Sequence, residues 1–214
     1  MRIETFTVGA LQENCYLLLD EDHGAAVLVD PGAEGERLAA AVEATGATLH
    51  GIWVTHAHMD HVGGIAAVRR RWPRAPIHLH PADAPLYASA ARQGAAYGLP
   101  IDEPPPYDHE FAEGDEVRVG GLAFQVMHAP GHAPGHVVLH GHGVAFVGDC
   151  LFAGSVGRTD LPLSNGAQLA SSLERIAALP AETRVLPGHG PATTIATERE
   201  SNPFLNGVAK VVRR

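Results

Sequence analysis

Short apolar runs alternate along the chain with longer segments of helical periodicity. The short runs have apolar residues at every second position or throughout, with turn residues at their ends, which is typical of strands. They predict strands at 4–8, 15–19, 25–30, 51–55, 77–80, 116–119, 123–128, 137–140, 144–148 and 184–186. Apolar residues three and four apart predict helices at 35–45, 62–72, 82–93, 166–179 and 194–200. The pattern therefore indicates a mixed α/β fold.

One long irregular connection interrupts this alternation. Residues 94–110 are rich in Pro and Gly, with three consecutive prolines at 104–106. We interpret the segment as a surface loop that joins two halves of one domain. The length of 214 residues and the 45% hydrophobic content fit one domain with a real core.

Charge and cysteine content narrow the class of protein. The net charge of −9 disfavours a nucleic-acid partner, because such binding depends on Lys and Arg neutralising phosphates. No stretch approaches the ~20 apolar residues that a membrane span needs, and the N-terminal residues lack the apolar core of a signal peptide. Cys15 and Cys150 lie in apolar runs, which indicates that they are reduced thiols in the core. We therefore expect a cytoplasmic protein without a membrane partner; its oligomeric state is not predicted.

Histidine is the unusual feature of the composition. The chain has 14 histidines, and four residues with metal-ligating side chains follow the apolar run 52–54: His56, His58, Asp60 and His61. Residues two apart in an extended segment point the same way, so His56 and His58 can share one metal. Asp60 and His61, where the chain turns into a helix, can aim at a second point. One motif thus offers half-sites for two metals.

Three further ligand types occur beside predicted strands. His132 lies in a Pro/Gly-rich loop between two strands, Asp149 follows the strand 144–148, and His189 follows the strand 184–186. Side chains at strand ends are held by a rigid scaffold, which is expected of a catalytic site. His78 and His80 repeat the two-apart spacing without a neighbouring carboxylate, so we do not expect them to bind metal.

The order of these motifs resembles that of metallo-β-lactamase-fold hydrolases over almost the whole chain. The resemblance implies an α/β fold, a four-layer αββα sandwich that forms a single domain over residues 1–214, with the site at one edge of the two sheets. Asp30, in the segment Leu28-Val29-Asp30-Pro31-Gly32, matches the early aspartate of the family. Its implied role is to support the metal loop by hydrogen bonding, since ligating imidazoles usually donate their other N–H.

Within this superfamily the chain resembles the short single-domain bacterial members of the glyoxalase II, or hydroxyacylglutathione hydrolase, group. The segments that carry the resemblance are Gln12-Glu13-Asn14-Cys15-Tyr16, Gly148-Asp149, Gly157-Arg158-Thr159-Asp160, Pro187-Gly188-His189-Gly190-Pro191 and Asn202-Pro203-Phe204-Leu205. The implied ligand sets are His56, His58 and His132 for metal 1, Asp60, His61 and His189 for metal 2, and Asp149 as the bridge. Few residues follow Pro191, so we expect no C-terminal glutathione-binding helical domain.

Two residues are candidates for contact with the substrate. Arg158 lies in a loop nine residues after Asp149 and could hold a substrate carboxylate, with an ion pair to Asp160 as the alternative. The resemblance places His136 beside the site as a hydrogen-bonding neighbour, and we include it as a candidate substrate-binding residue.

The ligand set predicts a hydrolase. Two divalent ions about 3.5–4 Å apart lower the pKa of a shared water from 15.7 to near 7 and so supply hydroxide. A thiolate, whose conjugate acid has a pKa of about 8.5, leaves without a general acid, whereas an amide nitrogen does not. We therefore expect hydrolysis of a small-molecule thioester such as S-lactoylglutathione to thiol and 2-hydroxy acid. Zinc is the first expectation, with iron or manganese as alternatives.

The main alternative is an iron-dependent persulfide dioxygenase, a group that shares the H-x-H-x-D-H and G-R-T-D motifs. Two departures oppose it: Val156 stands where that group has Cys, and its last histidine sits in P-A-H rather than Pro187-Gly188-His189. A nuclease or phosphodiesterase is disfavoured by the charge, a secreted β-lactamase by the missing secretion signal. A non-catalytic metal-binding protein would not need an open bridging position.

Overall fold

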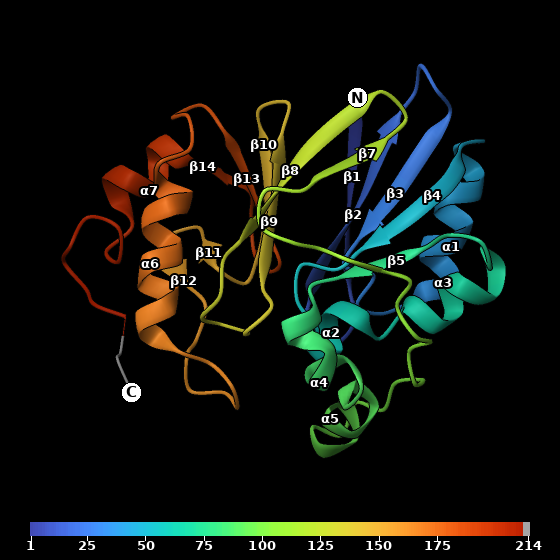
Figure 1. Cartoon of the computed structure of the whole chain (residues 1–214), viewed down its shortest axis with the longest axis horizontal. Helices are drawn as coiled ribbons and strands as arrows, with labels where there is room; N and C mark the ends of the chain where they lie inside the picture. The colour runs from blue at the N-terminus through green and yellow to red at the C-terminus, as the bar shows by residue number, and fades with distance from the viewer. Residues whose placement is uncertain (212–214) are drawn as a thin grey trace.

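The computed structural model describes residues 1–211, in which two six-stranded sheets lie face to face with helices over their outer faces (Figure 1). The first sheet has the order β1 (Arg2–Val8), β2 (Glu13–Asp20), β3 (Ala25–Val29), β4 (Thr48–Trp53), β5 (Ile77–Leu79) and β6 (His109–Glu110). The second has the order β14 (Thr193–Thr194), β13 (Arg184–Pro187), β10 (Val144–Gly148), β9 (Val137–Gly141), β8 (Leu122–His128) and β7 (Glu116–Val119). A separate ribbon pairs β11 (Leu151–Phe152) with β12 (Ser155–Val156).

The helices divide between the two halves of the chain. Those of the first half are α1 (Gly35–Ala44), α2 (Met59–Val62), α3 (Ile65–Arg71), the 3-10 turn η1 (Pro81–Asp83), α4 (Ala84–Tyr87) and α5 (Ala90–Ala96). Those of the second half are α6 (Gly166–Ala177) and α7 (Ile195–Ser201). Figure 1 shows α1 and α3 beside the first sheet and α6 and α7 beside the second. The layers are therefore α, β, β and α, as the resemblance implies.

Alternation along β2 shows how one strand serves two layers. Tyr16 and Leu18 are buried in the core between the two sheets, while Leu17 and Leu19 are buried in the core beneath the helices of the first half. Successive side chains of a strand point to opposite faces, so a strand covered on both sides reads as a continuous apolar run. All eight residues of β2 are buried for this reason.

The strand predictions are confirmed, and the errors concern short elements and helices. Each predicted strand is present, while β6, β11, β12 and β14, of two residues each, were not predicted. The predicted helix 82–93 is wrong in its continuity. The structure has the turn η1 followed by the two short helices α4 and α5, each of only one or two turns. In addition, α5 extends into the segment predicted to be irregular, residues 94–110.

The predicted helix 62–72 is wrong in the same way, since α2 and α3 are separate and Gly63-Gly64 lies between them. Neither glycine has a positive φ. A Cβ on Gly63 would lie 2.5 Å from the carbonyl oxygen of Gly32, and one on Gly64 would lie 2.7 Å from that of Pro31. The glycines are needed because another loop passes against them.

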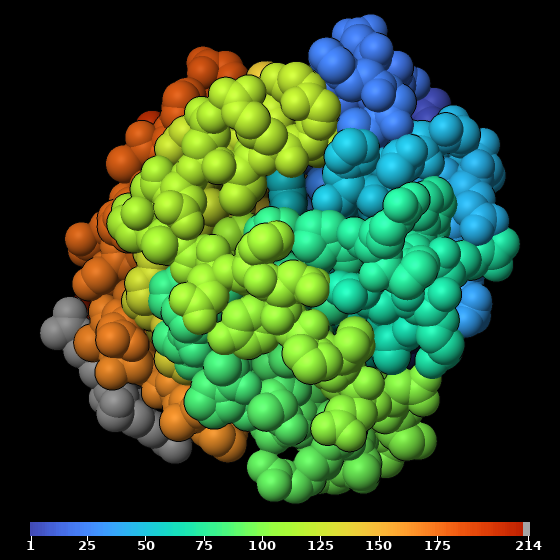
Figure 2. Space-filling model, turned by 45° about the vertical axis from the view of Figure 1, so that its right-hand side comes forward, coloured from blue at the N-terminus to red at the C-terminus, as the bar shows by residue number. Residues whose placement is uncertain are grey.

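The remaining irregular segment, residues 97–108, runs over the surface. In Figure 2 the green to yellow-green atoms of this part of the chain form a band across the face in view. The Tyr87 hydroxyl donates a hydrogen bond to the carbonyl oxygen of Pro105, which ties the segment to α4. Among the described residues, no helix is long and apolar enough to cross a membrane.

Candidate metal centre

The first set of candidate ligands lies where the chain leaves β4 and enters α2. His58 is extended, with φ −69° and ψ 152°, and immediately precedes α2, whose first turn holds Asp60 and His61. His56 and His58 are both buried, and their ring centroids lie 4.8 Å apart. His56 and His58 share one group of neighbouring ligand atoms, as their spacing predicts, but His61 also lies against His56, with ring centroids 4.0 Å apart.

The second sheet supplies the other three candidates. His132 lies in the loop between β8 and β9, Asp149 follows β10, and His189 follows β13. The strands β10 and β13 are parallel neighbours, so their carboxyl ends lie at one edge of the sheet. Asp149 and His189 are brought together there, facing the loop after β4 in the other sheet.

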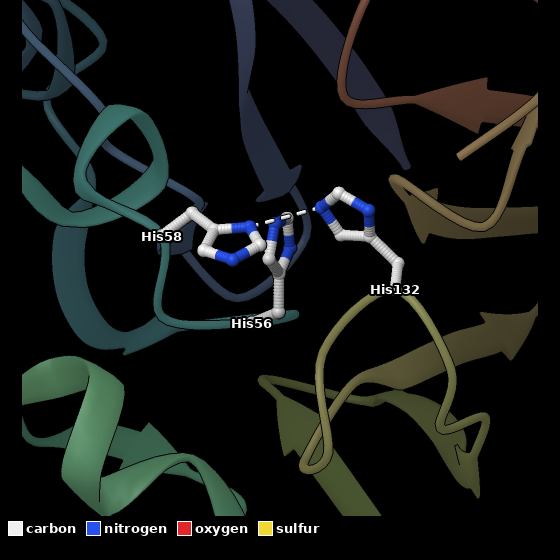
Figure 3. A group of neighbouring side chains, drawn as sticks. All are labelled: His56, His58 and His132. Carbon is white, nitrogen blue, oxygen red and sulfur yellow. Dashed lines mark hydrogen bonds between the residues drawn. The ribbon is translucent and has the colours of Figure 1, made fainter. Parts of the chain in front are cut away.

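Six of the seven predicted ligands meet as two groups of three, and Asp30, His56 and His61 form a further group that overlaps them. The candidate ligand atoms of His56, His58 and His132 lie within 4.8 Å of one another, and so do those of Asp60, His61 and His189. Figure 3 shows the first group: His56 and His58 come from one loop, and His132 reaches them from the opposite side. His58 Nδ1 lies 2.9 Å from His132 Nε2.

Asp149 lies between these two groups. Its Oδ1 is 3.5 Å from His61 Nε2, and its Oδ2 is 3.6 Å from His132 Nε2 and 3.7 Å from His189 Nε2. One carboxylate therefore reaches a histidine of each group. This is the arrangement required of a bridging ligand.

Hydrogen bonds fix which nitrogen each ring presents. The Nδ1–H of His61 donates to Asp30 Oδ2 at 3.1 Å, that of His132 to the carbonyl oxygen of Arg158 at 2.9 Å, and that of His189 to the carbonyl oxygen of Leu11 at 3.1 Å. Such contacts set the tautomer and the orientation of a ligating imidazole. In these three residues Nε2 is consequently the nitrogen that faces the cluster.

Asp30 anchors the loop as the resemblance implies. Its Oδ1 accepts the backbone N–H of Thr55 at 2.7 Å, and its Oδ2 accepts the Thr55 hydroxyl at 2.6 Å. Because that hydroxyl donates to Asp30, it accepts from His56 Nδ1, 3.2 Å away. Asp30 thus orients His61 directly and His56 through Thr55.

Burial and neighbouring charges set the protonation states. Burial, followed by the proximity of His132, lowers the pKa of His58 to about 3, and burial lowers the pKa of His56 well below its ordinary value. Burial opposes ionisation of Asp149, but the attraction of His61 outweighs it and holds the pKa of the carboxyl below its usual range. Neutral imidazoles and an ionised carboxylate are the forms that bind metal. Burial lowers the pKa of His61, but Asp149 and Asp30 outweigh it and raise that pKa well above its ordinary value, so His61 has to release a proton when an ion binds.

Unpartnered atoms show that cations fit this cluster. His56 Nε2, His61 Nε2 and Asp149 Oδ1 are buried and make no hydrogen bond. Buried polar atoms almost always have a partner, and these three are lone-pair donors directed at a common space. Nitrogen and carboxylate oxygen suit zinc, iron or manganese. The residues present fit divalent metal ions.

The cluster opens into a cleft of about 430 Å³. Its lining combines five of the candidate ligands with mainly apolar side chains: Leu11, His58, Met59, Asp60, Gln93, Tyr97, His132, Asp149, Phe152, Ser155, Val156, Arg158, Leu161 and His189. Arg158 lines the cleft as expected, and it also forms a two-fold ion pair with Asp160, at 2.6 and 2.7 Å. Both roles considered for this arginine are therefore compatible with its position.

His136 lies beneath the cluster rather than in the cleft. It is fully buried, its ring stacks on His56, and its Nε2 accepts the backbone N–H of Asp149 at 3.0 Å. In this structure it is a hydrogen-bonding neighbour of the centre without access to a substrate, which corrects the expectation that it binds one.

Three residues near the centre were missed by sequence reasoning. Asp83 accepts backbone N–H groups of two ligand-bearing loops, and Gln93 Oε1 accepts the backbone N–H of Met59 at 2.7 Å. Glu13 is buried with its Oε1 3.9 Å from His61 Nδ1, and burial raises its pKa well above the ordinary value. None lies in a ligand-spaced motif; only the segment that contains Glu13 was noticed, as part of a family resemblance.

Comparison with known proteins identifies the family. The model of the metallo-beta-lactamase superfamily matches residues 8–189, so the chain belongs to this superfamily. It is 38% identical over 210 residues to the hydroxyacylglutathione hydrolase GloC of Haemophilus influenzae, covering 96% of this chain and 99% of that one.

Three solved structures are similar along nearly the whole chain. The di-iron-bound form of TTHA1623 is 46% identical with a TM-score of 0.87, covering 94% of this chain and 100% of that chain. BLEG-1 B3 metallo-beta-lactamase is 36% identical with a TM-score of 0.89, covering 96% and 100%. ETHE1 from Myxococcus xanthus is 32% identical with a TM-score of 0.81, covering 97% and 85%. The protein is thus a metallo-hydrolase by superfamily, with a metal centre of His and Asp residues.

Proposed function

We propose that this protein hydrolyses the thioester of an S-2-hydroxyacyl thiol such as S-lactoylglutathione, to give the free thiol and a 2-hydroxy acid. The observation that carries the proposal is the placement of Asp149 between two groups of ligand atoms at the floor of an open cleft. Such a centre holds two ions and leaves room for a substrate, whereas a purely structural site is closed.

The proposal assigns the ligands in two sets and a bridge. One ion is held by His56, His58 and His132, the other by Asp60, His61 and His189, and both by Asp149. When bound, two divalent ions about 3.5–4 Å apart lower the pKa of a water between them and polarise a carbonyl group. Zinc is the first choice of metal, and the di-iron form of TTHA1623 supports iron as the second.

The protein itself orients these ligands and the substrate. Asp30 holds His61 directly, and His56 through Thr55, in the tautomer that directs Nε2 inward. Arg158, at the edge of the cleft, is placed to attract a substrate carboxylate, with Asp160 as its partner when the cleft holds none. Preorganised groups of this kind act without rearrangement during the reaction.

The leaving group decides which bond is cleaved. The Nδ1–H groups of His61, His132 and His189 are engaged with Asp30, Arg158 and Leu11, so these rings are not available as general acids. A thiolate leaves without protonation, while an amine does not. A thioester therefore suits the centre better than an amide. The similarity to GloC supports this substrate class, and the unpaired state of Cys15 and Cys150 supports a reducing compartment such as the cytoplasm.

Activity and metal content should be measured on the same purified sample. Thiol release from S-lactoylglutathione, followed with a chromogenic disulfide, should accompany a metal content near two ions per chain. A parallel assay of oxygen consumption with glutathione persulfide tests the dioxygenase activity, for which the similarity to ETHE1 is the specific argument. A third assay with a β-lactam is included because of the similarity to BLEG-1. Absence of thiol release together with oxygen uptake and a single iron would reject hydrolysis.

A further inference from the structure

Asp83 is a buried carboxylate outside the ligand motifs. It ends the turn η1 that follows β5, and no part of it is exposed to solvent. Its position in the sequence, 23 residues after Asp60 and 49 before His132, gives no sign of a role at the centre. Its two oxygens nevertheless reach both of the loops that carry the first group of ligands.

Each oxygen of Asp83 accepts one backbone N–H. Oδ2 accepts from Ala57 at 2.8 Å, and Oδ1 accepts from Gly135 at 2.5 Å. Ala57 lies between His56 and His58, while Gly135 belongs to the loop that carries His132. The two loops come from different sheets, so one carboxylate joins them across the molecule.

The contact leaves no room for a side chain at residue 135. A Cβ on Gly135 would lie 2.6 Å from the backbone nitrogen of Asp83 and 2.9 Å from its Cβ. The loop therefore approaches the turn as closely as a glycine allows. A second link, from the Val137 N–H to the Thr55 carbonyl oxygen at 2.8 Å, joins residues just before His56 and just after the loop that carries His132.

We propose that Asp83 is a positioning residue that sets the separation of His132 from His56 and His58, and thereby the affinity of one of the two metal ions. The proposal rests on the two-ion centre proposed above. The other group is positioned by different contacts, since His61 is held by Asp30 and His189 by the carbonyl oxygen of Leu11. Loss of Asp83 should thus weaken one ion selectively.

The chain offers a matched control in Asp20. This aspartate is also buried and also joins the two sheets, because its Oδ2 accepts the backbone N–H of Gly121 at 2.7 Å. Asp20 is the last residue of β2, and the first residue, Glu13, lies beside His61. At about 3.3 Å per residue along the strand, Asp20 is therefore roughly 23 Å from the centre. Asp20→Asn tests the cost of a weakened link between sheets away from the ligands.

The experiment measures metal affinity instead of turnover. Metal-free wild-type, Asp83→Asn and Asp20→Asn proteins are titrated with Zn²⁺ against a chromophoric chelator, and each metal-free protein is melted to compare stability. An amide in place of the carboxylate keeps the shape but can accept only one of the two N–H groups. We expect one of the two Zn²⁺ dissociation constants of Asp83→Asn to rise about 10- to 100-fold, as for other residues that orient metal ligands. The second dissociation constant of this variant should stay within about twofold of wild type, and so should both dissociation constants of Asp20→Asn.

Further variants identify the affected ion and allow the test to be completed if Asp83→Asn does not fold. In a His132→Ala background, Asp83→Asn should add less than about twofold, because the two changes act on the same ion. Gly135→Ala, which disturbs the contact from the other side, should reproduce the selective loss if Asp83→Asn does not fold. Equal weakening of both ions, or lowered stability with unchanged affinities, would overturn the inference and leave Asp83 a structural clamp.

The inference and the proposed function fail differently. If the wild-type protein binds a single ion or does not release thiol, the proposed hydrolase is rejected. The role of Asp83 is still decided in that case: Asp83→Asn should weaken a single ion that the His132→Ala variant loses, should leave unchanged an ion that this variant keeps, and Asp20→Asn should weaken neither.

Discussion

Asp149 is the side chain on which both groups of ligands depend, since its oxygens lie 3.5 and 3.6 Å from histidines of different groups. Asp149→Ala should lose both ions and lower kcat/KM by about 10³-fold or more, equivalent to ~4 kcal/mol. Asp149→Asn should retain some metal, because one oxygen remains. Metal analysis and thiol release measure both effects. Asp102→Ala, which removes a surface partner of Arg70, is the control and should match wild type. Two ions in the alanine variant would contradict the bridging role.

Gly188 tests how tightly the ligands are packed. A Cβ at this position would lie 2.3 Å from Asp149 Oδ1 and 2.7 Å from His61 Cε1. Gly188→Ala should therefore displace one of these ligands and reduce the metal content below two ions per chain. Gly51→Ala is the control, because its Cβ would meet its nearest neighbours at 3.5 Å or more. A fully loaded Gly188→Ala protein would show that the ligands can shift without loss.

The clustering of the candidate ligands was predictable from the sequence, but the residues that support them were not. His56, His58, Asp60 and His61 stand close enough in sequence for strand and helix geometry to relate them. Asp83 acts on backbone N–H groups 26 and 52 residues away, and such partners carry no side-chain signature. The place of His136 beneath the centre also depends on how the two sheets stack.

Among the described helices, α6 has a well-defined N-cap, Asn165, which immediately precedes its first residue. The Asn165 side chain accepts the backbone N–H groups of Ala167 and Gln168, both at 3.0 Å. Asn165→Ala should lower the free energy of unfolding by about 0.5–2 kcal/mol, because a capping side chain satisfies N–H groups that the helix leaves free. Urea denaturation measures the change. The exposed Gln168, replaced by Ala, should differ from wild type by less than about 0.5 kcal/mol; an equal loss in both would refute the cap.

Strands were easier to predict than helices in this chain because most of them are covered on both faces. The run of apolar residues in β2 and β3 follows directly from burial against helices on one side and a second sheet on the other. The break at Gly63-Gly64 arises instead from the loop at Pro31 and Gly32, which is distant in sequence. Local periodicity contains no information about that contact, so a single helix was predicted.

For the molecule as a whole, the buried histidines make stability depend on pH. Burial lowers the pKa of His78 to about 4, as it does for His80, and that of His58 to about 3. These groups bind protons in the unfolded chain near pH 6.5 but in the folded protein only at lower pH, so their contribution to stability is lost as the pH falls from 6.5 toward 4. Burial raises the pKa of Asp83 to about 6, which acts in the opposite direction between pH 4 and 6.

Glu13, His61 and His189, whose pKa values are also raised, act in the same direction as Asp83. They are outnumbered by the histidines whose pKa burial lowers: His56, His58, His78, His80, His132, His136 and His140. We expect the free energy of unfolding of the metal-free protein to fall on acidification by about 1.4 kcal/mol per pH unit or more near pH 5, which corresponds to the uptake of one net proton on unfolding. Urea denaturation between pH 4 and 7.5 measures the slope. His78→Gln, which changes none of the candidate ligands, should reduce it. A flat profile would show that the folded and the unfolded protein bind the same number of protons, which would contradict the prediction.

The division of the ligands between the two sheets has a consequence for biosynthesis. Four ligands are made early, at residues 56 to 61, while His132, Asp149 and His189 follow much later. Segment 187–190 is held by the first sheet, because the Asn14 side chain donates to the carbonyl oxygens of Pro187 and Gly190. For several seconds of translation the nascent chain therefore exposes half of each coordination sphere, without the bridge. The proposed two-ion centre therefore cannot be completed before the second sheet has docked against the first.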